Sequence, residues 1–436
     1  MAVNPGTSVP LSRSESFETA TYAKVTWRLI PFLFVCYVVA YLDRVNVGFA
    51  KLQMLNDLKF SETVYGLGAG IFFIGYFLFE VPSNIILHRV GARIWIARIM
   101  ITWGLISGAM VFITTPAMFY VVRFLLGVAE AGFFPGIILY LTYWYPSHLR
   151  GKITALFMTA IPASGVIGGP LSGWIMQALP GVHGLAGWQW MFILEALPSV
   201  IVGIMVIFYL QDRIRDAKWL SEDEKQLLEA NIQRESSQKE HHSLVQAFAN
   251  ARVWLMGLIY FCFVMGLYGV SFWLPTLIKA TGVKDPLDIG LLTAVPYAAA
   301  VVVMILVSRS ADKHRERRWH VAIPGAVGGI GLILSAVYGG NTLLAMAALT
   351  LATTGIVTTL PLFWSLPTAF LGGAAAAAGI ALINSLGNLA GFVSPYLVGW
   401  VKDLTHSTNV GMYALAASLF IGALLTLTVP ARLVNK

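Results

Sequence analysis

Four charged residues lie within stretches that are otherwise apolar, and they form two pairs along the chain. Asp43 and Arg44 are adjacent in one stretch, and Arg123 and Glu130 lie seven residues apart in another. If these stretches cross a bilayer, each charge at its centre costs roughly 2.5–3.5 kcal/mol. Such charges are kept where they face a polar interior and pair with one another. Carboxylates beside arginines are typical of carriers that move an anion together with protons.

The composition indicates a helical membrane protein. Hydrophobic residues make up 57% of the 436 residues and charged residues only 11%, and the mean hydropathy is +0.74. A soluble domain carries about 25% charged residues. The strand alternation of a membrane β-barrel is absent. Cys36 and Cys262 lie in separate apolar runs, which does not indicate a disulfide framework.

Apolar runs of about 20 residues, long enough to cross a bilayer as helices, occur twelve times. We expect spans at 27–49, 63–87, 94–114, 117–144, 152–178, 188–210, 253–278, 287–308, 320–338, 342–368, 375–401 and 409–430. A long polar interval separates the first six from the last six. The sequence therefore predicts an all-α integral membrane protein with twelve transmembrane helices in two pseudo-symmetric six-helix bundles.

The polar segments set the expected domain limits. These are an N-terminal tail at 1–26, a first bundle at 27–210, a central loop at 211–250, a second bundle at 251–430 and a C-terminal tail at 431–436. Within the central loop we predict a surface helix over residues 218–235. Ser221 followed by Glu224 is a capping-box pattern, in which each side chain bonds the other residue's backbone N–H.

Lysine and arginine are unevenly distributed over the polar segments. With the N-terminus inside, the cytoplasmic segments hold 22 of the 29 Lys and Arg residues, the external loops hold five, and two are intramembrane. Positive residues accumulate on the cytoplasmic side of membrane proteins, so we predict that both termini are cytoplasmic. The net charge of +8 then reflects topology, and we expect no nucleic-acid partner.

The two halves contain similar motifs, which indicates an internal duplication. The fifth span ends in Gly168-Gly-Pro-Leu-Ser-Gly-Trp174, and the eleventh ends in Val393-Ser-Pro-Tyr-Leu-Val-Gly-Trp400, about half a chain later. Two related six-helix halves around a central site form the architecture of alternating-access transporters.

Six further motifs resemble the major facilitator superfamily and, more narrowly, its anion:cation symporter family. They are Tyr41-Leu-Asp-Arg-Val-Asn-Val-Gly-Phe49, Gly127-Val-Ala-Glu-Ala-Gly-Phe-Phe-Pro-Gly136, Trp144-Tyr-Pro-Ser-His-Leu-Arg-Gly151, Gly187-Trp-Gln-Trp-Met-Phe192, Trp219-Leu-Ser-Glu-Asp-Glu-Lys225 and Ile383-Asn-Ser-Leu-Gly-Asn-Leu-Ala-Gly391. The resemblance covers essentially the whole chain. It implies a bacterial inner-membrane permease for acids such as 4-hydroxyphenylacetate, tartrate, phthalate or sugar acids. One departure is the loop after the second span, where Asn84 and His88 replace the superfamily's usual Gly and Asp.

Arg44 is the predicted substrate anchor, since a guanidinium is always charged and binds a carboxylate through two hydrogen bonds. The family resemblance also places an anion-binding arginine here. The alternative is that Arg44 only neutralises Asp43. These neighbours point about 100° apart on a helix, which makes them a poor pair.

Asp43, Arg123 and Glu130 are the predicted proton-coupling residues, as the family resemblance also implies. Burial raises the pKa of a carboxyl and a nearby arginine lowers it, so an arginine that moves switches proton affinity. Arg123 and Glu130 are about 10 Å apart along a helix, too far for direct contact. We expect Arg123 to form a salt bridge with Asp43, which leaves Glu130 able to protonate. The alternative is a static ion-pair lock between the first and fourth spans.

Five polar or aromatic residues are predicted to line the substrate pocket: Tyr76, Trp364, Ser365, Asn384 and Asn388. Amides and hydroxyls orient a ligand and aromatic rings supply contact area. Asn384 and Asn388 share a helix face because they are four residues apart. The alternatives are hydrogen bonds between helices for the asparagines and ordinary packing for Tyr76 and Trp364.

Glu80 and Glu195 are two further intramembrane acids, for which we expect structural roles in capping or latching helices. We assign them no part in substrate or proton binding.

The sequence as a whole predicts a proton-coupled symporter that imports a small organic carboxylate by alternating access. Protons serve as the coupling ion, and no other cofactor is expected. The runner-up is a proton-driven exporter of amphipathic compounds, which would have less need for Arg44. An intramembrane enzyme is not expected because no HExxH motif occurs, and a nucleotide-driven pump because no phosphate-binding loop occurs. One twelve-helix unit is self-sufficient, so we expect a monomer in the lipid bilayer.

Overall fold

The computed structural model describes residues 11–236, 250–370 and 373–435. Within these ranges, twelve helical segments are long and apolar enough to cross a membrane, which confirms the predicted number. The outer part of the expected N-terminal tail, the second part of the expected central loop and the last residue of the C-terminal tail lie outside them.

The first half of the chain supplies six spans, three of which are divided into two helices. They are α1 (Leu11–Val45) with α2 (Val47–Leu58), α3 (Glu62–Val90), α4 (Ala92–Gly108) followed by the 3₁₀ turn η1 (Ala109–Phe112), α5 (Pro116–Glu130) with α6 (Phe133–Thr142), α7 (Ser147–Met158) with α8 (Ala160–Ala178), and α9 (Gly187–Tyr209). The sequence predicted the fourth span as continuous, but it breaks directly after Glu130. Gly132 there has a φ of +86°, and a Cβ at this position would lie 2.3 Å from Ser83 Oγ. Glycine is therefore required at this break.

The second half supplies six spans, each a single helix in the described ranges. They are α12 (Ala251–Ala280), α13 (Pro286–His314), α14 (Arg318–Val337), α15 (Thr342–Phe370), α16 (Gly373–Thr405) and α17 (Asn409–Thr428), followed by the short α18 (Ala431–Val434). Two short 3₁₀ turns, η2 (Val182–Gly184) and η3 (Ile214–Asp216), lie on either side of α9 in the sequence, and α10 (Glu222–Ser236) lies in the central loop.

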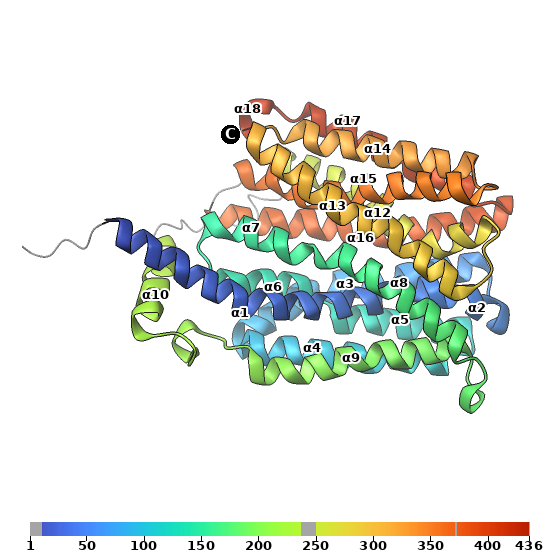
Figure 1. The fold of residues 1–436 in the computed structure, drawn as a ribbon, viewed down its shortest axis with the longest axis horizontal. Helices are drawn as coiled ribbons and strands as arrows, with labels where there is room; N and C mark the ends of the chain where they lie inside the picture. The colour runs from blue at the N-terminus through green and yellow to red at the C-terminus, as the bar shows by residue number, and fades with distance from the viewer. Residues whose placement is uncertain (1–10, 237–249, 371–372, 436) are drawn as a thin grey trace, which may run out of the picture.

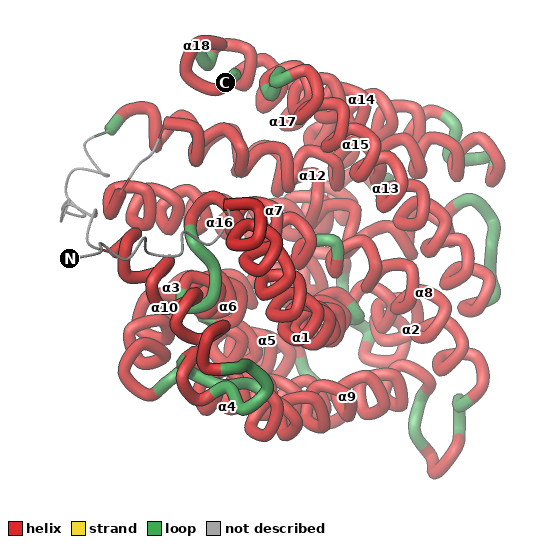
Figure 2. The backbone as a smooth tube through the Cα atoms, turned by 60° about the vertical axis from the view of Figure 1, so that its left-hand side comes forward, coloured by secondary structure: helices red, strands yellow, loops and turns green. Residues whose placement is uncertain are grey.

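The spans run side by side, with the two halves stacked on one another. In Figure 1 the first-half helices, blue to green, lie below the second-half helices, yellow to red. Helix α10, the start of α1 and the C-terminus lie at one end of the bundle, here named the α10 end. Helix α2 lies at the opposite end, here named the α2 end. Figure 2 shows helices joined by short loops, with no strand in the described part of the chain.

The two halves meet through small residues. Helix α8 packs against α13, α3 against α16, and α2 against α12. At Gly169 of α8, a Cβ would lie 2.6 Å from the carbonyl oxygen of Gly290 in α13. The backbones therefore touch here, which is the close packing that small residues permit between membrane helices.

Polar contacts between the halves gather at the α2 end. Asp403 of α16 accepts the backbone N–H groups of Glu62 and Thr63 at 3.2 and 2.7 Å. Lys402 Nζ lies 2.5 Å from Glu62 Oε1. Lys51 Nζ lies 3.3 Å from the centre of the Trp273 ring in α12. These contacts hold the two halves together at the α2 end.

The predicted surface helix is confirmed, including its capping box. The Ser221 N–H donates to Glu224 Oε2 at 2.8 Å, and the Glu224 N–H donates to Ser221 Oγ at 3.2 Å. Lys24 of α1 donates to both Glu224 oxygens at 3.0 and 2.8 Å. Hydrogen bonding to Lys24 holds the pKa of Glu224 below its usual value, so this contact fixes α10 against α1.

Candidate functional site

An ion pair between Arg44 and Glu130 forms the centre of the candidate site. Arg44 Nε donates to Glu130 Oε1 at 3.0 Å, and Nη2 bonds to the same oxygen. The third donor, Nη1, bonds to the Tyr268 hydroxyl of α12 at 3.1 Å. Arg44 is 5% exposed and Glu130 is 1% exposed. One buried guanidinium thus links α1 to α5 in its own half and to α12 in the other half.

Asp43 faces away from Arg44, into the first half. Its carboxylate accepts from Trp103 Nε1 at 3.1 Å and from Ser107 Oγ at 2.9 Å, both on α4. Ser199 of α9 donates to it as well. The expected poor pairing of the neighbours Asp43 and Arg44 is confirmed. Asp43 is a buried carboxyl held by neutral donors.

The predicted salt bridge between Arg123 and Asp43 is wrong. Arg123 instead donates to two backbone carbonyls of α3, those of Gly68 and Ala69, each at 3.2 Å. The physical reason is local. Small residues on α3 let the guanidinium of the neighbouring helix α5 reach the backbone, while neutral N–H and O–H donors already occupy Asp43. Arg123 therefore fixes α5 against α3.

A buried cavity between the halves brings several predicted residues together. Arg44, Tyr76, Asn384 and Asn388 line it, from α1, α3 and α16. The ring centres of Tyr76, Phe72 and Tyr41 each lie 5.6 Å from the Arg44 guanidinium carbon. The water-accessible volume is about 40 Å³. Since one water needs roughly 10–15 Å³ on this measure, the cavity has room for a few waters.

Tyrosines that the sequence analysis left out form much of the cavity wall. Tyr37 and Tyr41 of α1 and Tyr260 and Tyr268 of α12 line it together with Arg44. A signal was present in the sequence. On α1 the tyrosines and the arginine recur at helical spacing, so they share one face, and the α12 tyrosines are eight residues apart, again on one face.

The two asparagines are bonded across the halves by Glu80. Asn384 Nδ2 donates to Glu80 Oε1 at 2.8 Å, and Asn388 Nδ2 lies 3.5 Å from Glu80 Oε2. Glu80 is 4% exposed and belongs to α3. Its carboxyl therefore connects the halves, in agreement with the expected latching role. The interhelical bonding considered for the asparagines is also observed.

Two of the predicted pocket residues lie outside the cavity lining. Trp364 lies behind Tyr260, with ring centres 5.0 Å apart. The Ser365 hydroxyl donates to the Leu362 carbonyl of its own helix at 2.6 Å. Neither residue lines the cavity around Arg44.

The arrangement places a buried cation, Arg44, at the cavity wall among neutral hydrogen-bonding groups, with its ion-pair partner Glu130 next to it. Arg44 is suited to bind an anion, and Glu130 and Asp43 are suited to bind a proton. In the described ranges, His, Cys, Asp and Glu side chains form no group of three or more that could hold a metal ion.

Comparisons with known proteins identify the family to which the chain belongs. Residues 33–395 match the model of the Major Facilitator Superfamily. A putative tartrate transporter of Agrobacterium vitis is 51% identical, with 95% of each chain covered. A quinolone resistance transporter of Acinetobacter baumannii is 42% identical, with 96% of each chain covered.

A solved structure supports the same fold. The partially occluded, inward-open conformation of the xylose transporter XylE from Escherichia coli superposes with a TM-score of 0.74 at 13% identity. The match covers 93% of this chain and 99% of that one. The chain is therefore a twelve-span membrane transporter that belongs to the Major Facilitator Superfamily.

Proposed function

We propose that this protein is a proton-coupled symporter that imports a small organic carboxylate by alternating access. The observation that carries the proposal is the buried Arg44–Glu130 pair beside a cavity between the two halves. A carboxylate substrate and the Glu130 carboxylate are chemically alike, so they compete for the same guanidinium.

Competition for Arg44 couples the anion to a proton. Leaving a buried charge without its partner costs about 3–5 kcal/mol. Arg44 therefore keeps one carboxylate at all times, either that of Glu130 or that of the substrate. When Glu130 takes up a proton, it gives up the ion pair and the substrate anion replaces it. Proton and anion enter together, and for an anion of one negative charge the net charge of the site does not change.

The inter-half contacts indicate the direction of access. The α2 end is held by the Lys402, Asp403 and Lys51 contacts. By the distribution of Lys and Arg, we place the α10 end and both termini in the cytoplasm and the protein in the bacterial inner membrane as a monomer. Exchange of the ligand with the cytoplasm then takes place by opening of the α10 end. Because the cavity is small, the halves must separate further for release.

The cavity favours compact hydroxylated or aromatic acids. Tyrosine rings and hydroxyls surround Arg44, and the amides of Asn384 and Asn388 lie opposite. Such walls offer hydrogen bonds to hydroxyl groups and flat surfaces to rings. The similarity to a putative tartrate transporter supports a small dicarboxylic or hydroxy acid among these.

A second candidate function is proton-driven export of amphipathic compounds. The observation in its favour is the 42% identity to a quinolone resistance transporter. An export pocket binds ligands by apolar area and has less need for a buried guanidinium, so binding that is independent of Arg44 would favour it.

Thermal-shift stabilisation of the purified protein in detergent tests the proposal. The panel is 4-hydroxyphenylacetate, protocatechuate, phthalate, tartrate, galactonate and glucuronate at two pH values. We expect at least one acid to stabilise the parent and to lose this effect in Arg44→Ala. Arg98→Ala is the matched control, because Arg98 stacks on Trp95 at 3.8 Å and does not line the cavity. Stabilisation by amphipathic cations and by none of the acids would replace the symporter with the exporter.

A further inference from the structure

A further buried carboxyl, that of Glu195 in α9, lies beside Asp43 and takes no part in the site described above. Ser172 Oγ of α8 donates to Glu195 Oε1 at 2.6 Å, while Oε2 has no hydrogen-bond partner in the described part of the chain. Glu195 is 3% exposed. Buried polar atoms without a partner are rare in folded proteins and indicate an unassigned ligand or role.

Asn46, at the break between α1 and α2, is unpartnered at the same place. Its side chain is 1% exposed, and within the described residues neither its amide oxygen nor its amide nitrogen has a hydrogen-bond partner. The amide faces the Glu195 carboxyl without meeting hydrogen-bond geometry. The Asn46 amide, which can both donate and accept hydrogen bonds, thus lies beside the Glu195 carboxyl without a hydrogen bond of its own in the described part of the chain.

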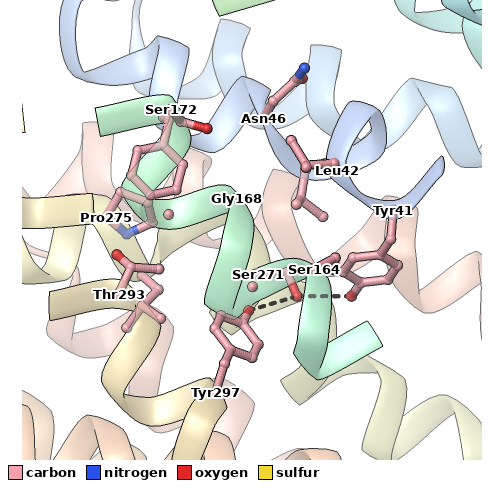
Figure 3. A pocket seen from close by; sticks show the side chains of 15 residues that line it. Tyr41, Leu42, Asn46, Ser164, Gly168, Ser172, Ser271, Pro275, Thr293 and Tyr297 are labelled. Atoms are coloured by element: carbon pink, nitrogen blue, oxygen red, sulfur yellow. Dashed lines mark hydrogen bonds between the residues drawn. The ribbon is translucent and has the colours of Figure 1, made fainter. Parts of the chain in front are cut away.

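A small cavity reaches this group from the α2 side of Tyr41. Asn46 and Ser172 line it together with residues of α12 and α13. Its water-accessible volume is about 20 Å³, enough for one water. Figure 3 shows Asn46 and Ser172 at the upper side of the cavity. The Ser271 hydroxyl, bonded to Tyr41 at 3.1 Å and to Tyr297 at 3.4 Å, lies at the lower side.

The groups that face the two carboxyls are neutral, apart from the carboxyls themselves. The neighbours of the Glu195 carboxyl are Ser172 of α8, Asn46 and Asp43. The neighbours of the Asp43 carboxyl are Trp103 and Ser107 of α4 and Ser199 and Glu195 of α9. The next acid near Asp43 is Glu130 of α5. No Lys or Arg of the described ranges forms a salt bridge with either carboxyl. The two acids lie close enough to repel each other when both are ionised. Two adjacent buried carboxylates without a cation are strongly disfavoured, so the pair needs at least one proton.

We propose that Glu195 is a second proton-binding carboxyl, coupled to Asp43 and reached from the small cavity past Asn46 and Ser172. This inference rests on the proposed symport, to which it adds a further proton for each anion. The step is a simple one. A hydronium ion in the cavity gives up a proton: one of its O–H bonds breaks as an O–H bond to a Glu195 oxygen forms, and a water molecule remains. The reverse occurs when the proton leaves. Intramembrane acids in polar cavities commonly serve as such relays.

Infrared difference spectroscopy of the purified protein between mildly acidic and mildly alkaline pH tests the protonation directly. The C=O stretching band of a protonated carboxylic acid should lose one component in Glu195→Gln and keep it, slightly shifted, in Glu195→Asp. The titration of that component should move in Asp43→Asn, because the two acids interact. Spectra of Glu195→Gln that superimpose on those of the parent would overturn the proposal.

Transport in proteoliposomes tests its consequence. With tartrate as the probe and an imposed gradient of one pH unit, each coupled proton raises the accumulation ratio about tenfold. Glu195→Gln should therefore accumulate about tenfold less tartrate, with unchanged tartrate exchange, and the control Arg98→Ala should keep the full ratio. An unchanged ratio in Glu195→Gln would contradict the inference alone. If the parent accumulates no tartrate, the symport of this acid fails, and the infrared result still decides the role of Glu195.

Discussion

Replacing Glu130 by glutamine should separate anion binding from proton binding. In the proposed mechanism, an anion reaches Arg44 only when Glu130 protonates and releases it. Glutamine is nearly isosteric and carries no charge, so the guanidinium has no competing carboxylate at any pH. The ligand-free variant then holds an unpaired buried cation, which costs about 3–5 kcal/mol. Anion binding restores the missing counter-charge, so the variant should gain more stability from the ligand than the parent does.

The size of the pH effect follows from the linkage of one proton to one anion. In the range where Glu130 is ionised, one linked proton lowers the apparent affinity of the parent about tenfold for each rise of one pH unit, equal to about 1.4 kcal/mol. In Glu130→Gln, the apparent affinity for the anion should not show this tenfold change for each pH unit. The assay is titration of the purified protein with tartrate, or with whichever acid stabilises it best, over a series of pH values.

Glu80→Gln is the matched control for this experiment. Glu80 is also a buried acid, but it bonds to Asn384 of the cavity wall and forms no salt bridge with an arginine of the described residues. The control should keep the pH slope of the parent. If Glu130→Gln keeps the full slope as well, the competition between Glu130 and the anion for Arg44 is refuted.

Three further predictions concern the framework around the site. Asp403→Ala removes the acceptor of two backbone N–H groups at the start of α3 and should raise hydrogen–deuterium exchange there several-fold. Gly169→Leu places a side chain 2.6 Å from a backbone oxygen of α13 and should lower stability by about 1–3 kcal/mol, seen as a lower melting temperature. The Lys24–Glu224 contact contributes about 0.2–1 kcal/mol to stability. Because Lys24 lowers the pKa of Glu224, this contribution is fully present above the pKa of Glu224 in the unfolded chain, about 4.3. It is lost as the pH falls through the lowered value, and exchange in α10 should then rise, with Glu224→Gln showing the raised exchange at neutral pH.

Local features of the fold could be predicted from the sequence. The twelve spans follow from runs of apolar residues, and the α10 cap follows from Ser221 and Glu224, three residues apart. The break after Glu130 was not predicted, although Gly132 is required there. Its cause is the close approach of Ser83 from α3, a contact between separate spans that a hydropathy pattern does not contain.

The sequence predicted most residues of the candidate site correctly, but it predicted less well which of these residues contact one another. Arg44, Tyr76, Asn384 and Asn388 do line one cavity. The prediction that Arg123 pairs with Asp43 was wrong, because Trp103, Ser107 and Ser199 supply enough neutral donors to hold the Asp43 carboxyl without a cation. Which donors reach a buried acid depends on how helices rotate against one another, and helical spacing constrains that only within a single helix.

Proton movement driven by the anion alone tests the central proposal most directly. Proteoliposomes with a pH-sensitive dye inside receive an inward gradient of tartrate, or of the acid that binds best, without any imposed pH gradient. The account predicts acidification of the interior as the anion enters, absent in Arg44→Ala and in protein-free liposomes. Uptake of the anion with no Arg44-dependent change of internal pH would contradict it.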